Sequence, residues 1–265
     1  MKTKQQKPTN KHFVGRVVSN TKIARDTVRI RVQLDWMPEI IAGQFLNVKL
    51  RGETRILRRP FAICDWDAQN KTVDFGVFIK GDGTRELSKL SAGDSIDVLM
   101  PLGNGFPTMA SSKKVMIIAG GIGAFPMLSV AKTNKTSFAF VGFRSSDHAI
   151  LLNDFKQYST ELHIATDDGS LGEKNFCTVL AKQAIQQIKP DVIFACGPDA
   201  MFHSMQKAFA DVWDKIPVYI SMEQRMACGF GACICCNQAV QVNGEVENLR
   251  VCCEGPVFLL KEVVL

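Results

Sequence analysis

The sequence Val115-Met-Ile-Ile-Ala-Gly-Gly-Ile-Gly-Ala-Phe-Pro126 decides the fold of the middle of the chain. Its five leading apolar residues predict a fully buried strand, and the glycines before a proline predict a tight turn that opens a helix. Further strands are predicted at 137–141, 162–165, 192–195 and 218–220. Helical patterns lie between them at about 148–158, 176–188 and 199–213. Strands that alternate with helices predict a parallel sheet covered on both faces.

Upstream of this stretch, residues 13–108 have the pattern of short β-strands. Val28, Ile30 and Val32 alternate with Arg29 and Arg31, as expected for a half-buried strand. Similar segments, separated by turn-forming residues, follow at 45–50, 61–65, 73–79 and 95–100. Several short strands at this spacing predict a small antiparallel barrel.

Downstream of Ser221 the sequence is rich in cysteine and glycine and has little periodicity. A unit of this size has a small core, so we expect a metal cluster to organise it. The sequence therefore predicts a multidomain β plus α/β protein with three domains, which span residues 1–110, 111–221 and 222–265.

The overall composition indicates a globular protein. The chain has 265 residues, of which 46% are apolar and 22% charged, and its formal net charge is +6. Lys2, Lys4, Lys7 and Lys11 lie in a polar N-terminal stretch that is expected to be a solvated tail and lacks the apolar core of a secretion signal. No run of about 18 apolar residues is present. We therefore expect a cytoplasmic protein with no membrane segment, and no nucleic-acid partner, because no aromatic residues are interleaved with the basic ones.

Nine cysteines are unusual for this length, and six of them lie between residues 228 and 253. Their clustering, together with the odd total, argues against disulfides and for metal ligands in a reducing compartment. Cys228, Cys233, Cys236 and Cys252 have the C-x4-C-x2-C spacing, with a distant fourth cysteine, of a plant-type [2Fe–2S] cluster.

Other interpretations of these cysteines stay open. A zinc site usually has two C-x2-C pairs, whereas the second half here offers adjacent Cys252 and Cys253. Buried free thiols are a further alternative. Cys235 and Cys253 are surplus to a four-cysteine set, and Cys253 is an alternative to Cys252 as the fourth ligand.

Two glycine turns lie at predicted strand ends. Gly121 and Gly123 open a helix after the first strand, and Cys196-Gly197-Pro198 follows a later one. Asp168 lies at a third strand end. Because ligands bind beyond the carboxyl ends of parallel strands, these residues predict a nucleotide site with its pyrophosphate at a helix N-terminus. The alternatives are turns without a ligand and, at Asp168, an ordinary acidic turn.

The barrel region carries a candidate flavin signature. Arg59 can donate two hydrogen bonds to a pyrophosphate, and Gly83 and Thr84 at a helix start can bind the same anion. Phe61, in the segment Arg59-Pro60-Phe61-Ala62, offers a flat apolar surface for a ring system. Each of these features alone is common in proteins. Their occurrence in this order along the chain strengthens the interpretation of all of them as a flavin site.

With these motifs in place, the chain resembles the electron-transfer subunits of bacterial two-subunit dihydroorotate dehydrogenases, within the ferredoxin-reductase superfamily. The residues that carry the resemblance are Leu57-Arg-Arg-Pro60, Gly81-x-Gly-Thr84, Gly120-Gly-Ile-Gly123, Ala165-Thr-Asp-Asp-Gly-Ser170, Cys196-Gly-Pro198, Arg225-Met-Ala-Cys-Gly229, Val251-Cys252 and Gly255-Pro-Val-Phe258. The Arg225–Gly229 segment and the Gly255–Phe258 ending are the most diagnostic.

The resemblance implies a Greek-key flavin-binding barrel with FAD, a Rossmann-like domain with transient NAD, and a [2Fe–2S] cluster on Cys228, Cys233, Cys236 and Cys252. It implies that Arg59–Ala62, Gly76, Val77, Phe78 and Gly83–Thr84 line the flavin. No side chain is expected to act as a catalytic acid or base. The family usually has Ser or Thr where Ala62 stands, so this chain lacks one hydroxyl near the flavin ring.

The resemblance also implies a partner, an FMN-containing catalytic subunit that oxidises dihydroorotate, in a heterotetramer of two plus two. Electrons would then pass from FMN through the cluster and FAD to NAD⁺, with the flavin joining one-electron to two-electron chemistry. The alternatives are a reductase subunit that serves ferredoxin, sulfur compounds or a hydrogenase, and a non-catalytic iron–sulfur or zinc redox sensor. Arg144, which follows a predicted strand, leaves NADP as an alternative to NAD.

Overall fold

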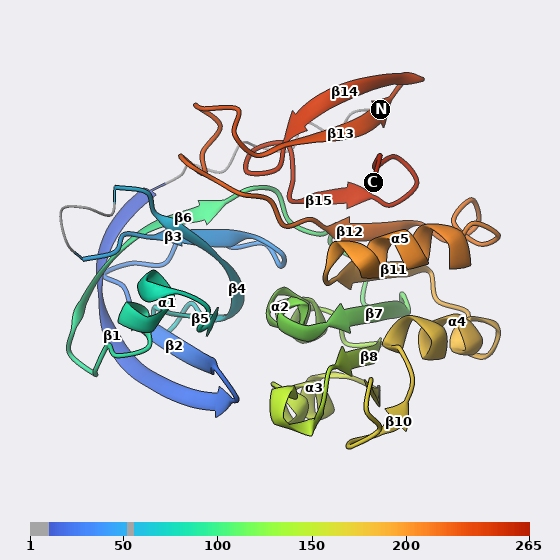
Figure 1. The fold of residues 1–265 in the computed structure, drawn as a ribbon, viewed down its shortest axis with the longest axis horizontal. Coiled ribbons are helices and arrows are strands. Elements are labelled where there is room, and N and C mark those ends of the chain that lie inside the picture. Colours follow the sequence, from blue (N-terminus) through green and yellow to red (C-terminus); the bar gives the residue numbers. More distant parts are fainter. Residues whose placement is uncertain (1–10, 52–55) are drawn as a thin grey trace.

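The structure, a computed structural model, describes residues 11–51 and 56–265. Of the predicted polar tail, the part before residue 11 lies outside the described residues, and Lys11 is the first residue of a barrel strand and not part of a tail. A closed barrel and a seven-stranded sheet with helices on both faces lie side by side, and a two-stranded hairpin lies above the upper edge of the sheet (Figure 1). The predicted combination of an antiparallel barrel with a parallel-strand sheet is confirmed.

The barrel has the strand order β1-β2-β5-β4-β3-β6, and all of its pairings are antiparallel. Its strands are β1 (Lys11–Ala24), β2 (Thr27–Gln33), β3 (Phe45–Val48), β4 (Arg59–Asp67), β5 (Thr72–Phe78) and β6 (Ser95–Leu102), with helix α1 (Asp82–Leu87) after β5. Alternate residues of each strand fill the interior, such as Ile30 and Val32 of β2. Strand β1 was not predicted, because Val14 and Val18 place apolar side chains on its exposed face and obscure the alternation.

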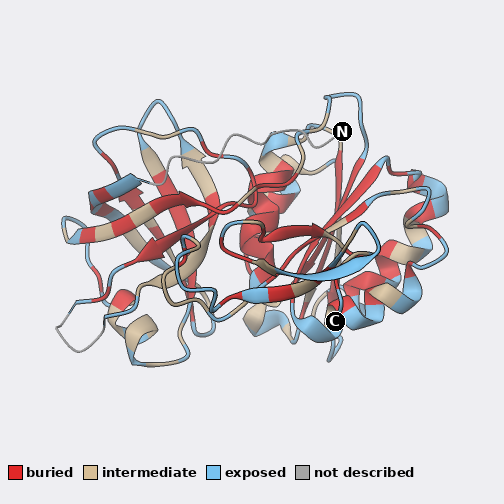
Figure 2. Cartoon of the chain, turned by 90° about the horizontal axis from the view of Figure 1, so that it is seen from above, coloured by how far each residue is buried: buried red, intermediate tan, exposed pale blue. Residues whose placement is uncertain are grey.

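The large sheet has the order β10-β9-β8-β7-β11-β12-β15. Its strands are β7 (Val115–Gly120), β8 (Ser137–Phe143), β9 (Glu161–Thr166), β10 (Glu173–Lys174), β11 (Val192–Cys196), β12 (Val218–Ser221) and β15 (Val257–Leu259). All neighbours are parallel except β12 and β15. The central strands β7, β8 and β11 of the sheet are buried along nearly their whole length, whereas β1, β4, β9 and β10 are largely intermediate or exposed (Figure 2).

The helices cover the two faces of this sheet as predicted. Helices α2 (Ala124–Thr133) and α3 (Leu152–Tyr158) share one core with Val115 and Ile117 of β7. Helices α4 (Cys177–Ile188) and α5 (Asp199–Ala208) share the other core with Met116 and Ile118. Alternate β7 side chains therefore enter opposite cores, which explains why β7 is apolar along its whole length.

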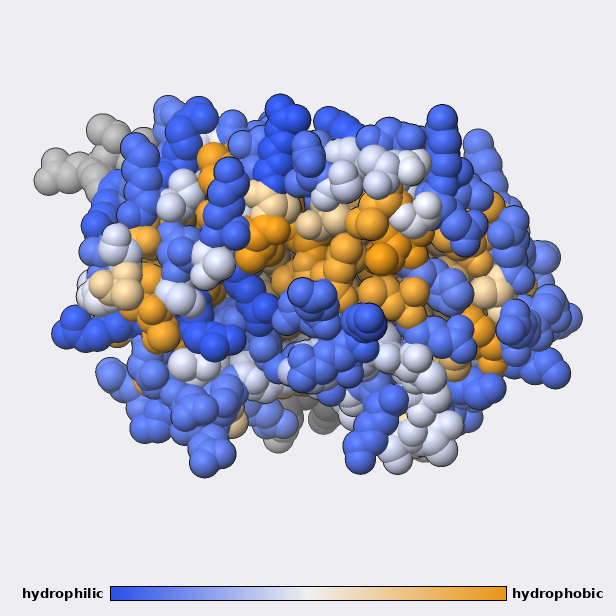
Figure 3. Space-filling view, turned by 90° about the horizontal axis from the view of Figure 1, so that it is seen from below, coloured by the Kyte–Doolittle hydropathy of each residue, from blue (hydrophilic) through white to orange (hydrophobic). Residues whose placement is uncertain are grey.

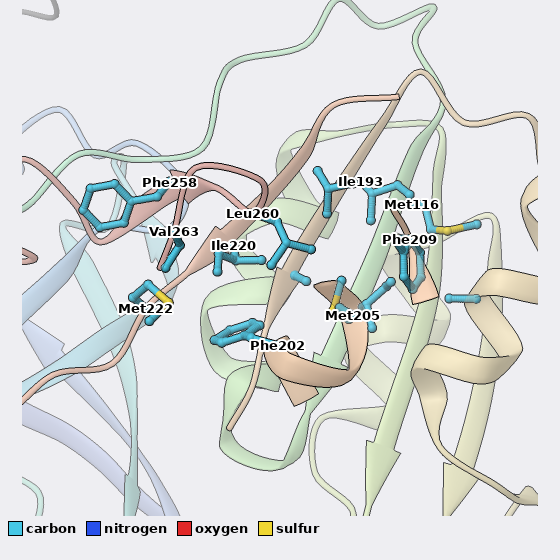
Figure 4. Packing of buried hydrophobic residues seen from close by; sticks show 14 of the residues in the cluster. Met116, Ile193, Phe202, Met205, Phe209, Ile220, Met222, Phe258, Leu260 and Val263 are labelled. Atoms are coloured by element: carbon cyan, nitrogen blue, oxygen red, sulfur yellow. The ribbon is translucent and has the colours of Figure 1, made fainter. Parts of the chain in front are cut away.

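The C-terminal residues add structure that the sequence did not predict. A hairpin forms from β13 (Asn237–Val242) and β14 (Glu245–Arg250), and Asn243-Gly244 makes its turn with both φ angles positive. An Asn-Gly pair between two strands is a strong hairpin signal, so the sequence did contain this information. After the hairpin, β15 returns to the large sheet, and Phe258, Leu260 and Val263 pack beside Ile220 and Met222 in the core that contains α5 (Figure 4).

Surface composition differs between regions. Seen from below, at the β10 end of the sheet, apolar side chains gather in a band across the middle of the molecule, framed by hydrophilic ones (Figure 3). Within the described residues, no helix has the length and apolar character that crossing a membrane requires.

An ion-pair network joins the barrel to the sheet domain. Arg29 of β2 donates to three carboxylates, at 2.7 Å to Asp74, 3.0 Å to Asp154 and 3.1 Å to Asp65. Asp154 belongs to α3, and Asp65 also pairs with Lys132 of α2. With the side chain of Asp74 only 3% exposed, these charges are stable there because they are paired.

Replacement of Arg29 with Met should lower the free energy of unfolding by about 3 kcal/mol. This value is near the lower end of the cost of breaking a buried ion pair, because Arg31 still pairs with Asp74 in the variant. Denaturant titration measures this change. The control is Arg25→Met, which removes an exposed pair with Asp26 and should change stability by less than about 1 kcal/mol. Equal effects of the two substitutions would contradict a structural role for the network.

Candidate functional site

One cavity of about 530 Å³ lies where all three predicted regions meet. Its volume is in the range of small-molecule sites. The barrel contributes Phe45 of β3, residues 60–62 of β4 and Gly76 and Phe78 of β5. The sheet and its helices contribute Ile122, Phe125, Pro126, Cys196 and Ser221, and the C-terminal region contributes residues 222–224, Met226 and Pro256.

Most of the residues predicted to line a flavin lie around this cavity. Pro60, Phe61, Ala62, Gly76, Phe78 and Thr84 contribute to its wall. Gly76 is packed against the ring of Phe125, where an added Cβ would approach ring atoms to 1.9 Å. A larger residue at this position would therefore force the two domains apart or fill the cavity.

Three other residues of the predicted flavin set are not among those lining the cavity. Val77 is fully buried in the barrel core, because it alternates with Gly76 and Phe78 along β5. Arg59 lies beside Gly83, with its Nε 3.7 Å from the position of a Cβ built there. These two residues, predicted to share one pyrophosphate, are thus neighbours in the structure.

Thr84 uses its hydroxyl within the turn that precedes α1. The Oγ1 atom accepts hydrogen bonds from the backbone N–H groups of Lys80 at 2.9 Å and Gly81 at 3.1 Å, and it donates to the carbonyl of Gly81 at 2.9 Å. The hydroxyl therefore stabilises the turn. Thr84 thus has a structural role in addition to lining the cavity.

The two predicted glycine turns lie against each other, because β7 and β11 are neighbours in the sheet. At Gly123 an added Cβ would lie 2.2 Å from the carbonyl oxygen of Cys196, so this glycine permits close packing of the two turns. Gly121 has a φ of +54° and open space where its side chain would be. Of the two, Gly121 leaves its backbone accessible to a phosphate.

Asp168 lies at the end of β9, two strands away from β7. Its carboxylate accepts hydrogen bonds from the hydroxyl of Ser170 at 2.6 Å and from the backbone N–H of Ser170 at 2.9 Å. These bonds lower its pKa. Asp168 is therefore ionised and exposed at the same edge of the sheet as the glycine turns.

Cys196 at the end of β11 and Glu223 just after β12 line the cavity. Burial, followed by the charge of Glu223, raises the pKa of the Cys196 thiol, so this thiol remains protonated near neutral pH. The pKa of Glu223 is also raised, first by desolvation and then by the charge of Asp199. Because Glu223 keeps surface exposed to solvent, this shift contributes little to stability. No motif pointed to Glu223, which follows β12 in an irregular segment.

The cysteine loop wraps tightly, as the predicted cluster requires. Gly229 and Gly231 have φ angles of +75° and +92°, conformations that favour glycine. The backbone N–H of Ala232 donates to Cys228 Sγ at 3.3 Å. Burial opposes ionisation of this thiol, but hydrogen bonds from the backbone of Phe230, from the Cys233 thiol and from further loop N–H groups lower its pKa to about 6.

The remaining thiols complete the arrangement. Cys236 and Cys252 are buried neighbours, and the backbone N–H of Cys252 donates to Cys236 Sγ at 3.4 Å. Among the described residues the four thiols lie as two neighbouring pairs, Cys228 with Cys233 and Cys236 with Cys252, and not as a closed set of three or more metal ligands. Thiols with N–H groups directed at sulfur, in a loop of positive-φ glycines, fit an iron–sulfur cluster.

The two surplus cysteines are exposed. Cys235 donates to the carbonyl of Arg225 at 3.7 Å, away from the other thiols. The sulfur of Cys253 lies against Gly231, 2.3 Å from where a Cβ would be built. Cys253 therefore contacts the first cysteine loop, so it stays an alternative fourth ligand.

Comparison with known proteins identifies these regions. A family model of the iron–sulfur cluster binding domain of dihydroorotate dehydrogenase B matches residues 223–264, and one of the oxidoreductase FAD-binding domain matches residues 15–106. The electron transfer subunit of dihydroorotate dehydrogenase B (NAD(+)) from Listeria monocytogenes is 38% identical over 256 residues, which cover 94% of this chain and 98% of the relative. The chain belongs to this family.

Other members agree with this assignment. The electron transfer subunit from Clostridium acetobutylicum is 35% identical over 260 residues, covering 96% of this chain and 98% of the relative. Within the dihydroorotate dehydrogenase B electron transfer family, the chain carries an FAD-binding domain and an iron–sulfur cluster domain. The predictions of FAD and of a [2Fe–2S] cluster are confirmed at this level.

Solved structures share the fold. The NADH-dependent reduced ferredoxin-NADP oxidoreductase, described for flavin-based electron bifurcation, has a TM-score of 0.81 and 26% identity, and the match covers 95% of this chain and 90% of that one. Phthalate dioxygenase reductase has a TM-score of 0.62 at 17% identity, covering 88% and 87%, and shows the fold alone. The ferredoxin-reductase-like architecture predicted for this family member is thus confirmed.

Alkylation should distinguish the cysteines of this family member. Burial raises the pKa of Cys64, Cys177 and Cys196, so few of these thiols are ionised below pH 9 and iodoacetamide should not modify them in the folded protein. Exposed Cys235 should react. Peptide mass mapping before and after unfolding measures the labelling of the buried thiols and of Cys235. Labelling of all nine cysteines after unfolding is the control. Reaction of folded Cys196 as fast as Cys235 would contradict the assignment of an inert thiol.

Proposed function

We propose that this chain is the electron transfer subunit of a dihydroorotate dehydrogenase B and passes electrons from an FMN-containing catalytic subunit through a [2Fe–2S] cluster and FAD to NAD⁺. One observation supports it above the others. Residues 222–256, which contain all the clustered cysteines, leave the sheet after Ser221 and return at Val257, and these two residues pair with each other. Both ends of this excursion line the cavity, and so does Met226, two residues before Cys228, so the first of the four thiols is held near it.

When bound, the flavin would exchange electron pairs with a nicotinamide and single electrons with an iron–sulfur cluster. The residues of this chain bind the flavin, orient it and shield it from water. Pro60, Phe61 and Phe125 make the cavity wall apolar, which excludes water from a ring held there. No side chain at the cavity needs to take up a proton for electrons to pass.

We assign the flavin to the cavity wall formed by Pro60, Phe61, Ala62, Gly76 and Phe78. In this proposal Arg59 and Gly83, which are neighbours, bind the pyrophosphate, and Thr84 shapes the turn beside them. Val77 acts from within the barrel by supporting β5.

We assign the cluster to Cys228, Cys233, Cys236 and Cys252. Loop N–H groups already point at two of the four sulfurs, which favours thiolate ligands. Adjacent Cys253 and distant Cys235 are left outside this set.

We assign the nicotinamide nucleotide to the carboxyl edge of the sheet. Gly121, Gly123 and the turn Cys196-Gly197-Pro198 would receive the nucleotide near the cavity, where Cys196 is a packing contact. The negative charge of ionised Asp168 disfavours the additional phosphate of NADP at the same edge of the sheet. This repulsion supports NAD over NADP as the nucleotide.

The proposed partner is the catalytic subunit named by the family, in a heterotetramer of two plus two. The proposed compartment is the cytoplasm, which fits nine free cysteines in a chain of this length. Exposed Phe230 and Ile234 lie on the cysteine loop and offer an apolar contact for that partner.

A second candidate follows from the likeness to the NADH-dependent reduced ferredoxin-NADP oxidoreductase. In that case the partner would be a different oxidoreductase subunit, with the same cavity and the same thiols. The partner alone separates the two functions.

Two measurements on the protein from its own cells test the proposal. Anaerobically purified protein should show flavin absorption that NADH bleaches rapidly, and it should co-purify with an FMN protein that oxidises dihydroorotate. Co-purification with a ferredoxin-linked subunit would favour the second candidate. Colourless protein with zinc in place of iron would overturn both.

Serine substitutions test the cluster assignment. Cys228→Ser, Cys233→Ser, Cys236→Ser and Cys252→Ser should each lose most of the iron, from about two atoms per chain, because each removes one thiolate. Cys235→Ser is the matched control and should retain it. Iron analysis with visible spectra measures the change. Retention of iron by Cys252→Ser together with its loss in Cys253→Ser would transfer the fourth ligand to Cys253.

A further inference from the structure

One polar residue connects the barrel wall to the cysteine loop. Asn47 of β3 is 1% exposed, and its strand neighbours Leu46 and Val48 point into the barrel core. Because strand residues alternate, Asn47 faces the same side as Phe45, which lines the cavity. Across the strand pair, Asn47 lies opposite Pro60 of β4, another cavity residue.

The side chain of Asn47 reaches the first cysteine of the loop. Its Nδ2 donates a hydrogen bond to the carbonyl oxygen of Cys228 at 3.3 Å. Gly229, the next residue, packs so closely that a Cβ there would lie 1.9 Å from the same nitrogen. The Cys228–Gly229 peptide therefore packs directly against the side-chain amide of Asn47.

Folding stability alone does not explain an asparagine at this position. Its Oδ1 is buried and has no hydrogen-bond partner among the residues that the structure describes. A buried acceptor without a donor disfavours folding, whereas an apolar side chain of the same shape would pack without that cost. The contribution of the carboxamide is thus its contact with Cys228.

We propose that Asn47 is a positioning residue for electron transfer between the cluster and the flavin, an inference that rests on the proposed function. The hydrogen bond fixes the Cys228 peptide against β3, and the β3–β4 pairing fixes β3 relative to Pro60 at the flavin wall. One electron leaves the reduced flavin and is gained by the oxidised cluster, or the reverse. Asn47 itself gains no electron and transfers no proton.

The physical reason is distance. The rate of electron tunnelling falls steeply as two centres separate, so a loop that is free to shift against the barrel lowers the mean rate. An N–H group directed at the peptide of a cluster ligand also changes the electron density at that ligand. Loss of Asn47 should therefore affect both the transfer rate and the spectrum of the cluster.

The experiment uses the full chain with FAD and cluster bound, and compares variants at matched FAD and iron content. Asn47→Leu and Asn47→Asp keep the approximate shape and remove the N–H donor. With NADH as reductant, stopped-flow absorption should show flavin bleaching at the wild-type rate, followed by cluster reduction that is slowed severalfold. The electron paramagnetic resonance spectrum of the reduced cluster should also shift in both variants.

Two further variants separate positioning from stability. Asn47→Ser keeps a hydroxyl donor and should recover part of the rate. Asn20→Ala is the matched control. Asn20 is a second barrel asparagine whose Oδ1 has no partner within residues 11–51 and 56–265, but its Nδ2 donates to the carbonyls of Leu87, Ser88 and Leu90, away from the cysteine loop. Its cluster spectrum and its rate of cluster reduction should match wild type.

The outcomes distinguish this inference from the proposed function. If wild-type protein contains flavin and cluster but Asn47→Leu reduces its cluster at the wild-type rate with an unchanged spectrum, the inference is overturned and the function stands. If wild-type protein contains no iron or no flavin, the proposed function itself has failed.

Discussion

The antiparallel pairing of β15 with β12 is the constraint on which the site depends. Ser221 and Val257 pair directly, and the backbone N–H of Met222 donates to the carbonyl of Pro256 at 2.8 Å. The 222–256 excursion therefore begins and ends at one point, beside a cavity that both of its ends help to line. Met226, two residues before Cys228, also lines the cavity, so the first cysteine of the loop lies near it.

The hydrophobic core reinforces this attachment. Cys236 and Cys252 are buried in the same cluster of apolar residues as Ile220, Phe258 and helix α5. Asn104, after β6, adds a polar clamp from the barrel side, since its side chain donates to the carbonyl oxygens of Glu254 and Val257 and accepts from the N–H of Val257. The cluster region is thus held by the sheet core on one side and by the barrel on another. A rigid support of this kind is what cofactor-to-cofactor electron transfer requires, because the reacting centres must stay at a fixed separation.

The relation between barrel and sheet domain has a different physical basis. Arg29 unites carboxylates from β4, β5 and α3, and Phe125 of α2 fits into the space that Gly76 leaves open. The ionic contacts favour one mutual orientation, because each buried charge is stable only when it is paired. The aromatic contact sets how closely the domains approach at the cavity. Together they set the barrel wall and the sheet-domain wall of a cavity that the C-terminal region completes.

The sequence by itself determined the types of element and the chemistry of the ligands. Period-two patterns predicted five of the six barrel strands, alternation of strands and helices predicted the sheet, and the spacing of Cys228, Cys233, Cys236 and Cys252 predicted a cluster. These are local signals, because they depend on residues close together in the chain. Tertiary structure decided the rest. The pairing of Ser221 with Val257, the contact of Asn47 with Cys228 and the placing of Glu223 at the cavity join residues distant in sequence, or depend on how an irregular segment packs. No local period records such contacts, since burial and hydrogen bonding across domains arise only when the whole chain has folded.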